Sequence, residues 1–309
     1  MRLHAAEPVF FTRKGKTLFS SAREMTAYCE KTGCSLSRAA LVYESTLLGM
    51  SMDRALEEMV FRYGIMKDSI AYGLEDGNVR MQLLQPTARK ILSATEEGRT
   101  SIGGALTRAA ARSMAVLHTS SSMGTICAAP TGASAGVIPA VMATLQEEKK
   151  LSDFEVAQAL FAAAAVGLVL VRRATFAAEI AGCQVEIGAA GAMAAAAVVD
   201  AMGGSAAQAA DAAAISFQNS MGSVCDLVQG VCEIPCHTRN AASASSSFIC
   251  ADLILGGYHN PIPLDETVDA VMNVGLTMPR ELRVTSLGGI AVTPSALSLK
   301  RRESSPSED

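Results

Sequence analysis

The chain has 309 residues and a net charge of −4, with 50% hydrophobic residues, 18% charged residues and no tryptophan. This length suits one large domain or two modest ones, and the composition excludes a disordered or collagen-like chain. The slightly acidic charge argues against nucleic acid as the main partner, because contact with phosphates requires a basic surface. Since aromatic residues make up only 5% of the chain, we expect closely packed helices with a core of small and aliphatic side chains.

Residues 1–20 are predicted to be irregular, and they contain no apolar core of the length found in secretory signals. Eight cysteines without an export signal indicate a reducing compartment, where structural disulfides are rare. We therefore predict a cytoplasmic protein with free thiols.

The most apolar stretch, residues 156–171, is shorter than the roughly 20 residues that cross a bilayer. We interpret it as a buried helix and expect no association with a membrane.

Helical periodicity begins at Ser21 and continues to about Gly73, because apolar residues recur at every third or fourth position. Gly33 and Gly49 are expected to interrupt this region as turns. A connection that contains glycine and proline follows, and residues 103–117 form the next predicted helix.

Three helix starts are indicated in the second half of the chain. Ser152 and Glu155 fit a capping box in front of an apolar run. Ser205 and Gln208 fit a second capping box. Asp265 opens a further helix, because an acidic residue is stabilised at a helix N-terminus.

Signals for strands are weak, with few alternating runs and no Asn-Gly hairpin. We predict a predominantly all-α fold: a single compact helical domain over residues 21–299, with buried loops rich in glycine, proline and serine. The irregular residues 1–20 precede this domain. The polar residues 300–309 are predicted to form a disordered tail.

One segment, residues 118–140, is rich in serine, threonine, glycine and proline but contains no Lys, Arg, Asp or Glu. A solvated linker would carry charge, so we expect this loop to be buried, with partners for its backbone groups. Buried glycine-rich loops of this kind often line ligand sites.

Four cysteines fall between residues 183 and 236, in segments punctuated by glycine and proline. Cys225, Cys232 and Cys236 lie close together in the sequence, and Cys183 precedes Cys225 by 42 residues. Thiolates in such turns can converge on a metal or an iron–sulfur cluster. The spacing alone leaves three alternatives open: an iron–sulfur cluster, a structural zinc site, or buried cysteines without a ligand.

Several segments together resemble the α chain of bacterial iron–sulfur L-serine dehydratases. The resemblance covers nearly the whole chain, from about residue 21 to residue 294. The segments that carry it are SSSMGTICAAPTGASAGVIPA (120–140), ATFAAEIAGCQVEIGAAGAM (174–193), NSMGSVCDLVQGVCEIPCHTRN (219–240) and LGGIAVTP (287–294).

This resemblance implies a 4Fe–4S cluster held by three cysteines with spacings of 42 and 11, which Cys183, Cys225 and Cys236 reproduce. Cys232 is an additional cysteine that the family pattern lacks, and whether it can ligate stays open. Cys127 is expected to be an apolar filler. The implied reaction is elimination of water from L-serine at the open iron, a Lewis acid, to give pyruvate and ammonia.

The resemblance also implies a substrate site and a partner. The loop after Cys127 is expected to line the pocket, and an arginine suits a carboxylate clamp. The implied substrate-binding residues are Pro130, Thr131, Gly132, Ser134, Arg239 and Asn240. The catalytic base is expected on a separate β chain, with His118 and His237 as secondary candidates, so the protein should be one subunit of a heteromeric enzyme.

Departures from the family pattern at Arg172–Arg173, Ile180 and Leu227 leave the exact substrate open, and the two arginines suggest a substrate with a second acidic group. One alternative is a cluster-dependent L-cysteine desulfidase or related lyase. Another is a metal-stabilised structural subunit. A pyridoxal-phosphate enzyme is disfavoured, because no lysine lies in a phosphate-binding glycine motif.

Overall fold

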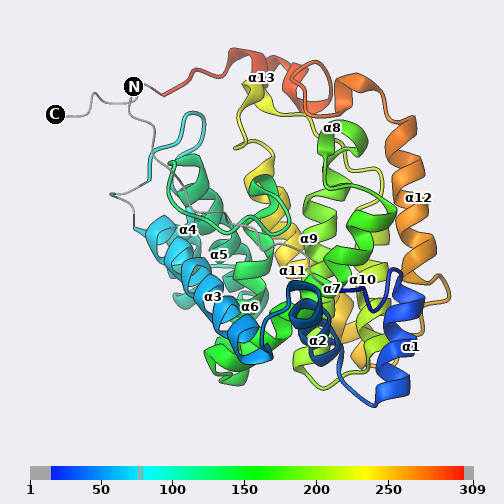
Figure 1. Cartoon of the computed structure of the whole chain (residues 1–309). Helices are drawn as coiled ribbons and strands as arrows, with labels where there is room; N and C mark the ends of the chain where they lie inside the picture. Colours follow the sequence, from blue (N-terminus) through cyan, green and yellow to red (C-terminus); the bar gives the residue numbers. More distant parts are fainter. Residues whose placement is uncertain (1–14, 76, 78, 303–309) are drawn as a thin grey trace, which may run out of the picture.

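The computed structural model describes residues 15–75, 77 and 79–302 (Figure 1). Within these residues all regular elements are helical, and the β-structure is confined to an isolated bridge between Cys225 and Arg283. The predicted all-α fold is therefore confirmed. The α-helices are α1 (Ala22–Thr32), α2 (Leu36–Leu48), α3 (Met52–Leu74), α4 (Ala88–Glu96), α5 (Gly104–Ser121), α6 (Val137–Lys149), α7 (Asp153–Arg173), α8 (Ala178–Ala181), α9 (Ile187–Ala201), α10 (Ala206–Asn219), α11 (Cys236–Leu255), α12 (Leu264–Thr277) and α13 (Pro294–Ser298).

The helix ends follow the local sequence closely. Gly33 and Gly49 end α1 and α2 in the left-handed conformation, with φ of 65° and 66°, which glycine adopts without steric cost. Both predicted capping boxes are present: Ser152 begins α7 and Ser205 begins α10. Asp265 lies in the first turn of α12, as predicted.

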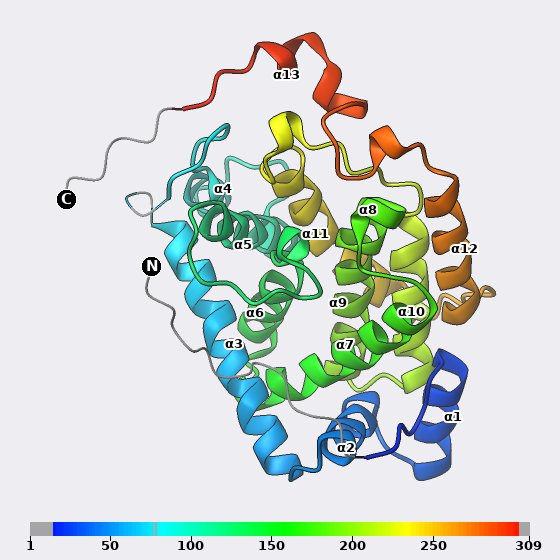
Figure 2. The same cartoon turned by 45° about the horizontal axis from the view of Figure 1, so that its top comes forward.

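Helix α9 forms the centre of the molecule (Figures 1 and 2). It packs against α6, α7, α10 and α11, and its residues from Ile187 to Val199 are buried. Alanine and glycine dominate this helix, so neighbouring backbones can approach it closely. The core is thus built mainly of small and aliphatic side chains, as the composition predicts.

Two helices in the described part of the chain are long and apolar enough to cross a membrane. These are Asp153–Arg173 and Cys183–Ala201, and 67% and 89% of their most apolar windows are buried inside the protein. Burial of that extent is the behaviour of core helices. The interpretation of residues 156–171 as a buried helix is therefore confirmed.

The ends of the described chain are held by hydrogen bonds. The backbone N–H of Gly15 donates to the carbonyl of Leu47 (3.0 Å), while the preceding residues of the predicted irregular segment lie outside the described residues. Arg301 and Arg302, in the predicted polar tail, donate to groups of Gln229, Gln82 and Leu84. Residues 303–309 of that tail also lie outside the described residues.

Candidate metal centre and adjoining cavity

Three separate segments bring the predicted cysteine ligands together. Cys183 begins a short 3₁₀ helix before α9, Cys225 lies in the loop after α10, and Cys236 is the first residue of α11. The Cys225 loop is fixed by backbone hydrogen bonds, because its N–H donates to Leu282 and its carbonyl accepts from Val284, both at 2.8 Å.

Glycine is required where the Cys183 segment approaches the Cys225 loop. Gly182 has φ of +77°, and a Cβ there would lie 2.8 Å from the carbonyl oxygen of Ser223. The adjacent Gln184 is fully buried and links the same segments, since its N–H donates to Ser223 and its side-chain oxygen accepts from Gly222. The relative position of the cysteines is therefore set by backbone contacts.

Two of the three predicted ligand thiols converge with a carboxylate group. The sulfur atoms of Cys183 and Cys225 and a carboxylate oxygen of Glu186 all lie within 4.8 Å of one another. Cys236 is close enough to Cys232, Cys183 and Cys225 for these cysteines to influence its pKa. Cys183, Cys225 and Cys236 are only 1–3% exposed.

The hydrogen bond to Cys225, together with burial, raises the pKa of Cys183, and the same bond lowers the pKa of Cys225. The hydrogen bond to Cys232 and burial raise the pKa of Cys236 well above its ordinary value. A metal that binds these groups as thiolates would displace their protons. Thiolate sets of this kind suit iron–sulfur clusters and zinc, so the donor chemistry fits an implied cluster.

Glu186 joins this centre and was missed by the sequence analysis. It precedes α9 directly, and its carboxyl group accepts a hydrogen bond from Thr131. Burial raises the pKa of this carboxyl group. Its position three residues after Cys183 is the signal that could have identified it, because that spacing recurs on one side of a helical turn.

The predicted substrate loop lies against the same centre but is largely occupied by its own contacts. Thr131 and Ser134 form a capping box around the short helix Gly132–Ser134. The Asn240 amide donates to the carbonyls of Ala133 (2.8 Å) and Cys236 (2.9 Å), and thus ties the loop to α11. Pro130 lines a different, largely apolar cavity between α2 and α7.

Arg239 is held in place by its own chain. One terminal nitrogen donates to the carbonyl of Val224 (2.6 Å), and the other lies 2.9 Å from a carboxylate oxygen of Asp226. Asp226 is 1% exposed, and its second oxygen accepts from the N–H of Ile290 (2.8 Å). This buried carboxylate therefore orients the guanidinium group.

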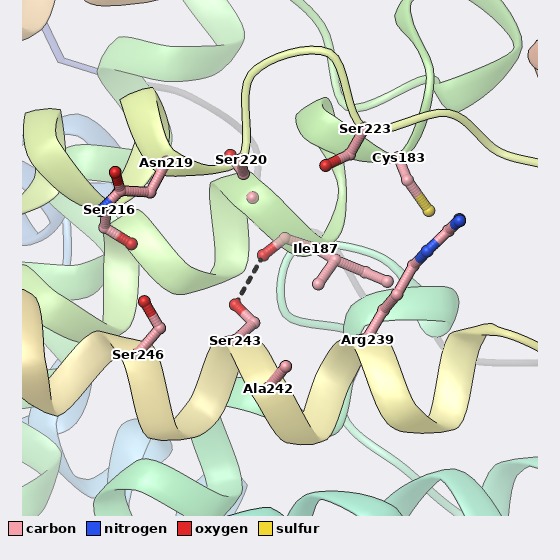
Figure 3. A pocket seen from close by; sticks show the side chains of 11 residues that line it. Cys183, Ile187, Ser216, Asn219, Ser220, Ser223, Arg239, Ala242, Ser243 and Ser246 are labelled. Atoms are coloured by element: carbon pink, nitrogen blue, oxygen red, sulfur yellow. Dashed lines mark hydrogen bonds between the residues drawn. The ribbon is translucent and has the colours of Figure 1, made fainter.

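A cavity of about 280 Å³ adjoins Cys183 and is lined mainly by residues of α9, α10 and α11. Figure 3 shows Cys183 and Arg239 at one end, and Ser216, Asn219 and Ser246 at the other. Among the described residues that line the cavity, Arg239 carries the only formal charge. Hydroxyl and amide groups complete the polar lining, namely those of Ser216, Asn219, Ser220, Ser223, Ser243 and Ser246.

Of the predicted substrate-binding residues, Arg239 lines this cavity, whereas the serine and asparagine groups were not predicted. The only sequence signal for them was the unusual serine content of α11. Gly188 forms part of the cavity wall, where a Cβ would lie 2.1 Å from the hydroxyl oxygen of Ser220. The cavity therefore depends on close packing between α9 and α10.

The two candidate histidines lie together inside the protein. Their ring centroids are 5.3 Å apart, both side chains are 0% exposed, and Nε2 of His237 lies 3.1 Å from the hydroxyl of Ser121. Burial lowers the pKa of His237 to about 3. His237 is therefore neutral at physiological pH and forms part of the packing between α5 and α11.

The paired arginines at the end of α7 are engaged away from this cavity. Arg172 donates to the hydroxyl of Tyr43 (3.3 Å), and Arg173 forms ion pairs with Asp269 and Asp265 of α12. Because these charges already have partners within the chain, the structure gives no support for a second acidic group on the substrate.

The other two departures also have structural partners. The carbonyl of Ile180 accepts from Arg283 (3.0 Å), and its side chain is 40% exposed. Leu227 packs against the core, and its carbonyl accepts from the hydroxyl of Ser286 (2.6 Å). Cys127 packs against the core as well, with its sulfur 3.5 Å from the carbonyl of Arg62.

Residues 20–291 match the model of the family described as serine dehydratase alpha chain. The chain is 33% identical to the probable L-serine dehydratase, alpha chain, of Bacillus subtilis, over 92% of this chain and 95% of that protein. It is 32% identical to the L-serine dehydratase, alpha chain, of Peptoniphilus asaccharolyticus, over 92% and 98% of the two chains. It is also 29% identical to L-serine dehydratase 2 of Escherichia coli, over 89% of this chain and 61% of that protein. The chain therefore belongs to the serine dehydratase alpha-chain family.

Proposed function

We propose that this chain is the catalytic α subunit of an iron–sulfur L-serine dehydratase, a lyase that converts L-serine to pyruvate and ammonia. Cys183, Cys225 and Cys236 would hold a 4Fe–4S cluster. The observation that carries the proposal is the convergence of Cys183 and Cys225 with Glu186, beside a cavity that is lined by Arg239 and serine hydroxyls. The relatives named alpha chain support a β chain as partner.

A cluster accounts for the donor set better than structural zinc does. Structural zinc sites usually use paired cysteine knuckles with two to four residues between the ligands. Among the four cysteines between residues 183 and 236, only Cys232 and Cys236 have that spacing, and the three predicted ligands come from three segments, separated by 42 and 11 positions. When bound, a cluster with three protein thiolates supplies an iron with an open coordination position, a Lewis acid for the substrate hydroxyl.

The side chains of this protein then bind and orient the substrate. A guanidinium group carries five N–H donors, and the contacts with Val224 and Asp226 leave donors of Arg239 available for the substrate carboxylate. The cavity hydroxyls can accept hydrogen bonds from the substrate ammonium group. A base from the β chain would remove the Cα proton; with loss of hydroxide this gives 2-aminoacrylate, which hydrolyses to pyruvate and ammonia.

Anaerobic purification of the chain with analysis of iron, sulfide and the visible spectrum tests the cofactor. We expect a broad visible absorption band and about four irons per chain, as for a 4Fe–4S centre. Cys183→Ser, Cys225→Ser and Cys236→Ser should each lose most of the iron. Cys127→Ser is the matched control and should keep it, because Cys127 lies against the carbonyl of Arg62.

Addition of a β chain to the iron-loaded protein should yield pyruvate from L-serine. Release of sulfide from L-cysteine at a higher rate would favour the desulfidase alternative. A colourless protein that contains zinc in place of iron would contradict the proposed mechanism.

A further inference from the structure

We propose that Cys183, Glu186 and Cys225 form a site for a single Fe²⁺ ion, which the chain binds before sulfide is present and which begins the loading of the centre. In this proposal Glu186 is a ligand of the single ion and not of the completed cluster. The inference rests on the proposed function only where it states that a cluster follows; the single-ion site itself is argued from the described donor atoms.

Three donor atoms of the centre lie close enough for one ion. The sulfur atoms of Cys183 and Cys225 and a carboxylate oxygen of Glu186 are all within 4.8 Å of one another. Around a tetrahedral ion with bonds of about 2.3 Å to sulfur and about 2.0–2.2 Å to oxygen, the ligand atoms lie about 3–4 Å apart. A small rotation of the side chains therefore brings all three donors onto a single ion.

Among the described cysteines, Cys236 lies outside this close set of donors. In a 4Fe–4S cluster each protein thiolate binds a different iron, so the thiolates must stand further apart than the ligands of one ion. The geometry therefore separates two donor sets. A single ion uses the set that contains Glu186, whereas a cluster uses the set that contains Cys236.

The backbone holds Glu186 beside Cys183. Residues 183–185 form a 3₁₀ helix, and the N–H of Glu186 donates to the carbonyl of Cys183 (3.1 Å). Side chains three residues apart eclipse each other in such a helix. The carbonyl of Glu186 accepts from the N–H of Ala190 (2.9 Å), so the backbone is fixed on both sides and only the side chain has to adjust.

The carboxylate of Glu186 is not used to cap the helix that follows it. Glu186 is the N-cap residue of α9, yet its side chain makes no capping hydrogen bond. It is half-buried, while Cys183 and Cys225 are 1% and 3% exposed. Two thiolates and a carboxylate at this separation repel one another, and a divalent cation offsets that repulsion. The arrangement therefore favours binding of a cation.

The chemistry of the donors suits a divalent ion of the first transition row. Thiolates bind iron, cobalt and zinc ions, and a carboxylate oxygen completes such a set. Affinity at a given site rises from Fe²⁺ to Co²⁺, so Co²⁺ should bind here at least as tightly as Fe²⁺. Cobalt is the better probe, because thiolate ligands give it charge-transfer bands.

The test titrates the full metal-free chain with Fe²⁺ alone, and in a second series with Co²⁺ alone, under anaerobic conditions without sulfide. We expect one ion to bind per chain, with thiolate-to-cobalt charge-transfer bands in the second series. X-ray absorption of the cobalt form should show two sulfur ligands, with oxygen in the other positions. This measurement requires no variant, and three sulfur ligands would overturn the proposal.

Two variants assign the ligands. Glu186→Gln should weaken binding of either ion at least tenfold, because an anionic ligand is lost. Cys236→Ser should retain the single ion, although it loses the cluster. Wild-type affinity in Glu186→Gln, or loss of the single ion in Cys236→Ser, overturns the proposal.

Glu179→Gln is the matched control for the change of charge. Glu179 is an exposed acidic residue of α8, close to Cys183 in the chain but outside the set of donors. Its affinity for Fe²⁺ and Co²⁺ should remain within about twofold of wild type. A loss as large as that of Glu186→Gln would show that general charge, and not ligation, holds the ion, and would overturn the proposal.

Loading with iron and sulfide separates the single-ion site from the cluster. At limiting iron, Glu186→Gln should load several-fold more slowly than wild type, and with excess iron both should reach the same iron content. Loading of Glu186→Gln at the wild-type rate, or to a lower final content, overturns the proposal. If wild-type protein binds one ion but never forms a cluster, the proposed cofactor fails and the single-ion site stands; a cluster without a saturable single-ion site overturns the single-ion proposal alone.

Discussion

At the scale of single residues, buried carboxylates hold the loops that carry the cysteines. Asp226 orients Arg239 and accepts from the N–H of Ile290, and Glu233 accepts from three consecutive backbone N–H groups. Such charge-assisted hydrogen bonds are stronger than those between neutral groups. These acidic side chains therefore stabilise the geometry of the centre from outside the ligand set.

Replacement of one of these carboxylates should loosen the centre. Glu233→Gln puts an amide NH₂ where a carboxylate oxygen accepts hydrogen bonds, so at least one buried N–H group loses its acceptor, at a cost of about 1–3 kcal/mol. We expect a lower melting temperature and, on dilution under anaerobic conditions, faster loss of iron than in wild type. Thermal melts and iron release measured by chelation check this prediction.

Glu155→Gln is the matched control for that variant. Glu155 is an exposed carboxylate in the capping box of α7, and glutamine serves equally at this position. Its iron release should equal that of wild type. If Glu233→Gln also retains iron as wild type does, Glu233 has no part in holding the cysteine loop.

At the scale of elements, small residues set how closely helices pack. Gly73 of α3 faces α5, where a Cβ would lie 1.8 Å from the carbonyl oxygen of Ala115. No side-chain adjustment can relieve a clash with backbone. The contact between α3 and α5 therefore requires glycine at this position, even though glycine is unfavourable within a helix.

Two glycines of α3 give a matched pair of variants. Gly73→Ala should destabilise the fold by about 1–3 kcal/mol or more, because it forces α3 and α5 apart. Gly64→Ala has no atom within 4 Å of the new Cβ, and it should stabilise the protein by up to about 1 kcal/mol through helix propensity. Urea unfolding of both variants measures the difference, and equal effects would contradict the packing argument.

At the scale of the whole molecule, distant segments cap the N-termini of the first helices. Asp200, at the end of α9, accepts from the backbone N–H of Ser37 in α2 (3.0 Å). Asp265 of α12 accepts from Ala22 and Arg23 at the start of α1. Carboxylates are favourable at helix N-termini, so these contacts join the N-terminal helices to the core.

The Asp200 contact makes a prediction about pH. Burial raises the pKa of Asp200 above its ordinary value of 3.8. Between pH 3.8 and the raised pKa, the folded protein therefore retains a proton that the unfolded chain has released. The contribution of Asp200 to the free energy of unfolding therefore falls as the pH rises from 3.8 through the raised pKa. Asp200→Asn removes this fall, so its stability relative to wild type should improve with rising pH.

Chemical denaturation from pH 3.5 to 7.5 measures this trend. The exposed Asp252→Asn on α11 is the control, and its stability relative to wild type should vary less over the same range. A stability difference for Asp200→Asn that is constant across the range would contradict the assignment of a buried, destabilised charge.

Much of the helical framework could be predicted because its signals are local. Ser152 and Ser205 cap their helices through residues three positions away, and Gly33 and Gly49 adopt the left-handed conformation that ends a helix. Such preferences depend on the backbone within a few residues, so the sequence alone contains them.

The cysteine set could be named only through the family resemblance, since spacing by itself left zinc, a cluster and unliganded cysteines open. Glu186, the serine-lined cavity and the partners of Arg172 and Arg173 emerged only from the tertiary structure. These groups are far apart in the chain or carry no local signature. The angles and distances at which α9, α10, α11 and α12 pack decide which of them meet.

The sequence by itself thus determined the helical class, several helix boundaries and the residues that could carry the chemistry, because short-range propensity and residue type decide these. The tertiary structure alone decided that Glu186 joins Cys183 and Cys225, that Arg239 is oriented by Asp226, and that Arg173 of α7 pairs with α12. Those outcomes depend on long-range packing, in which each contact is fixed jointly by several helices.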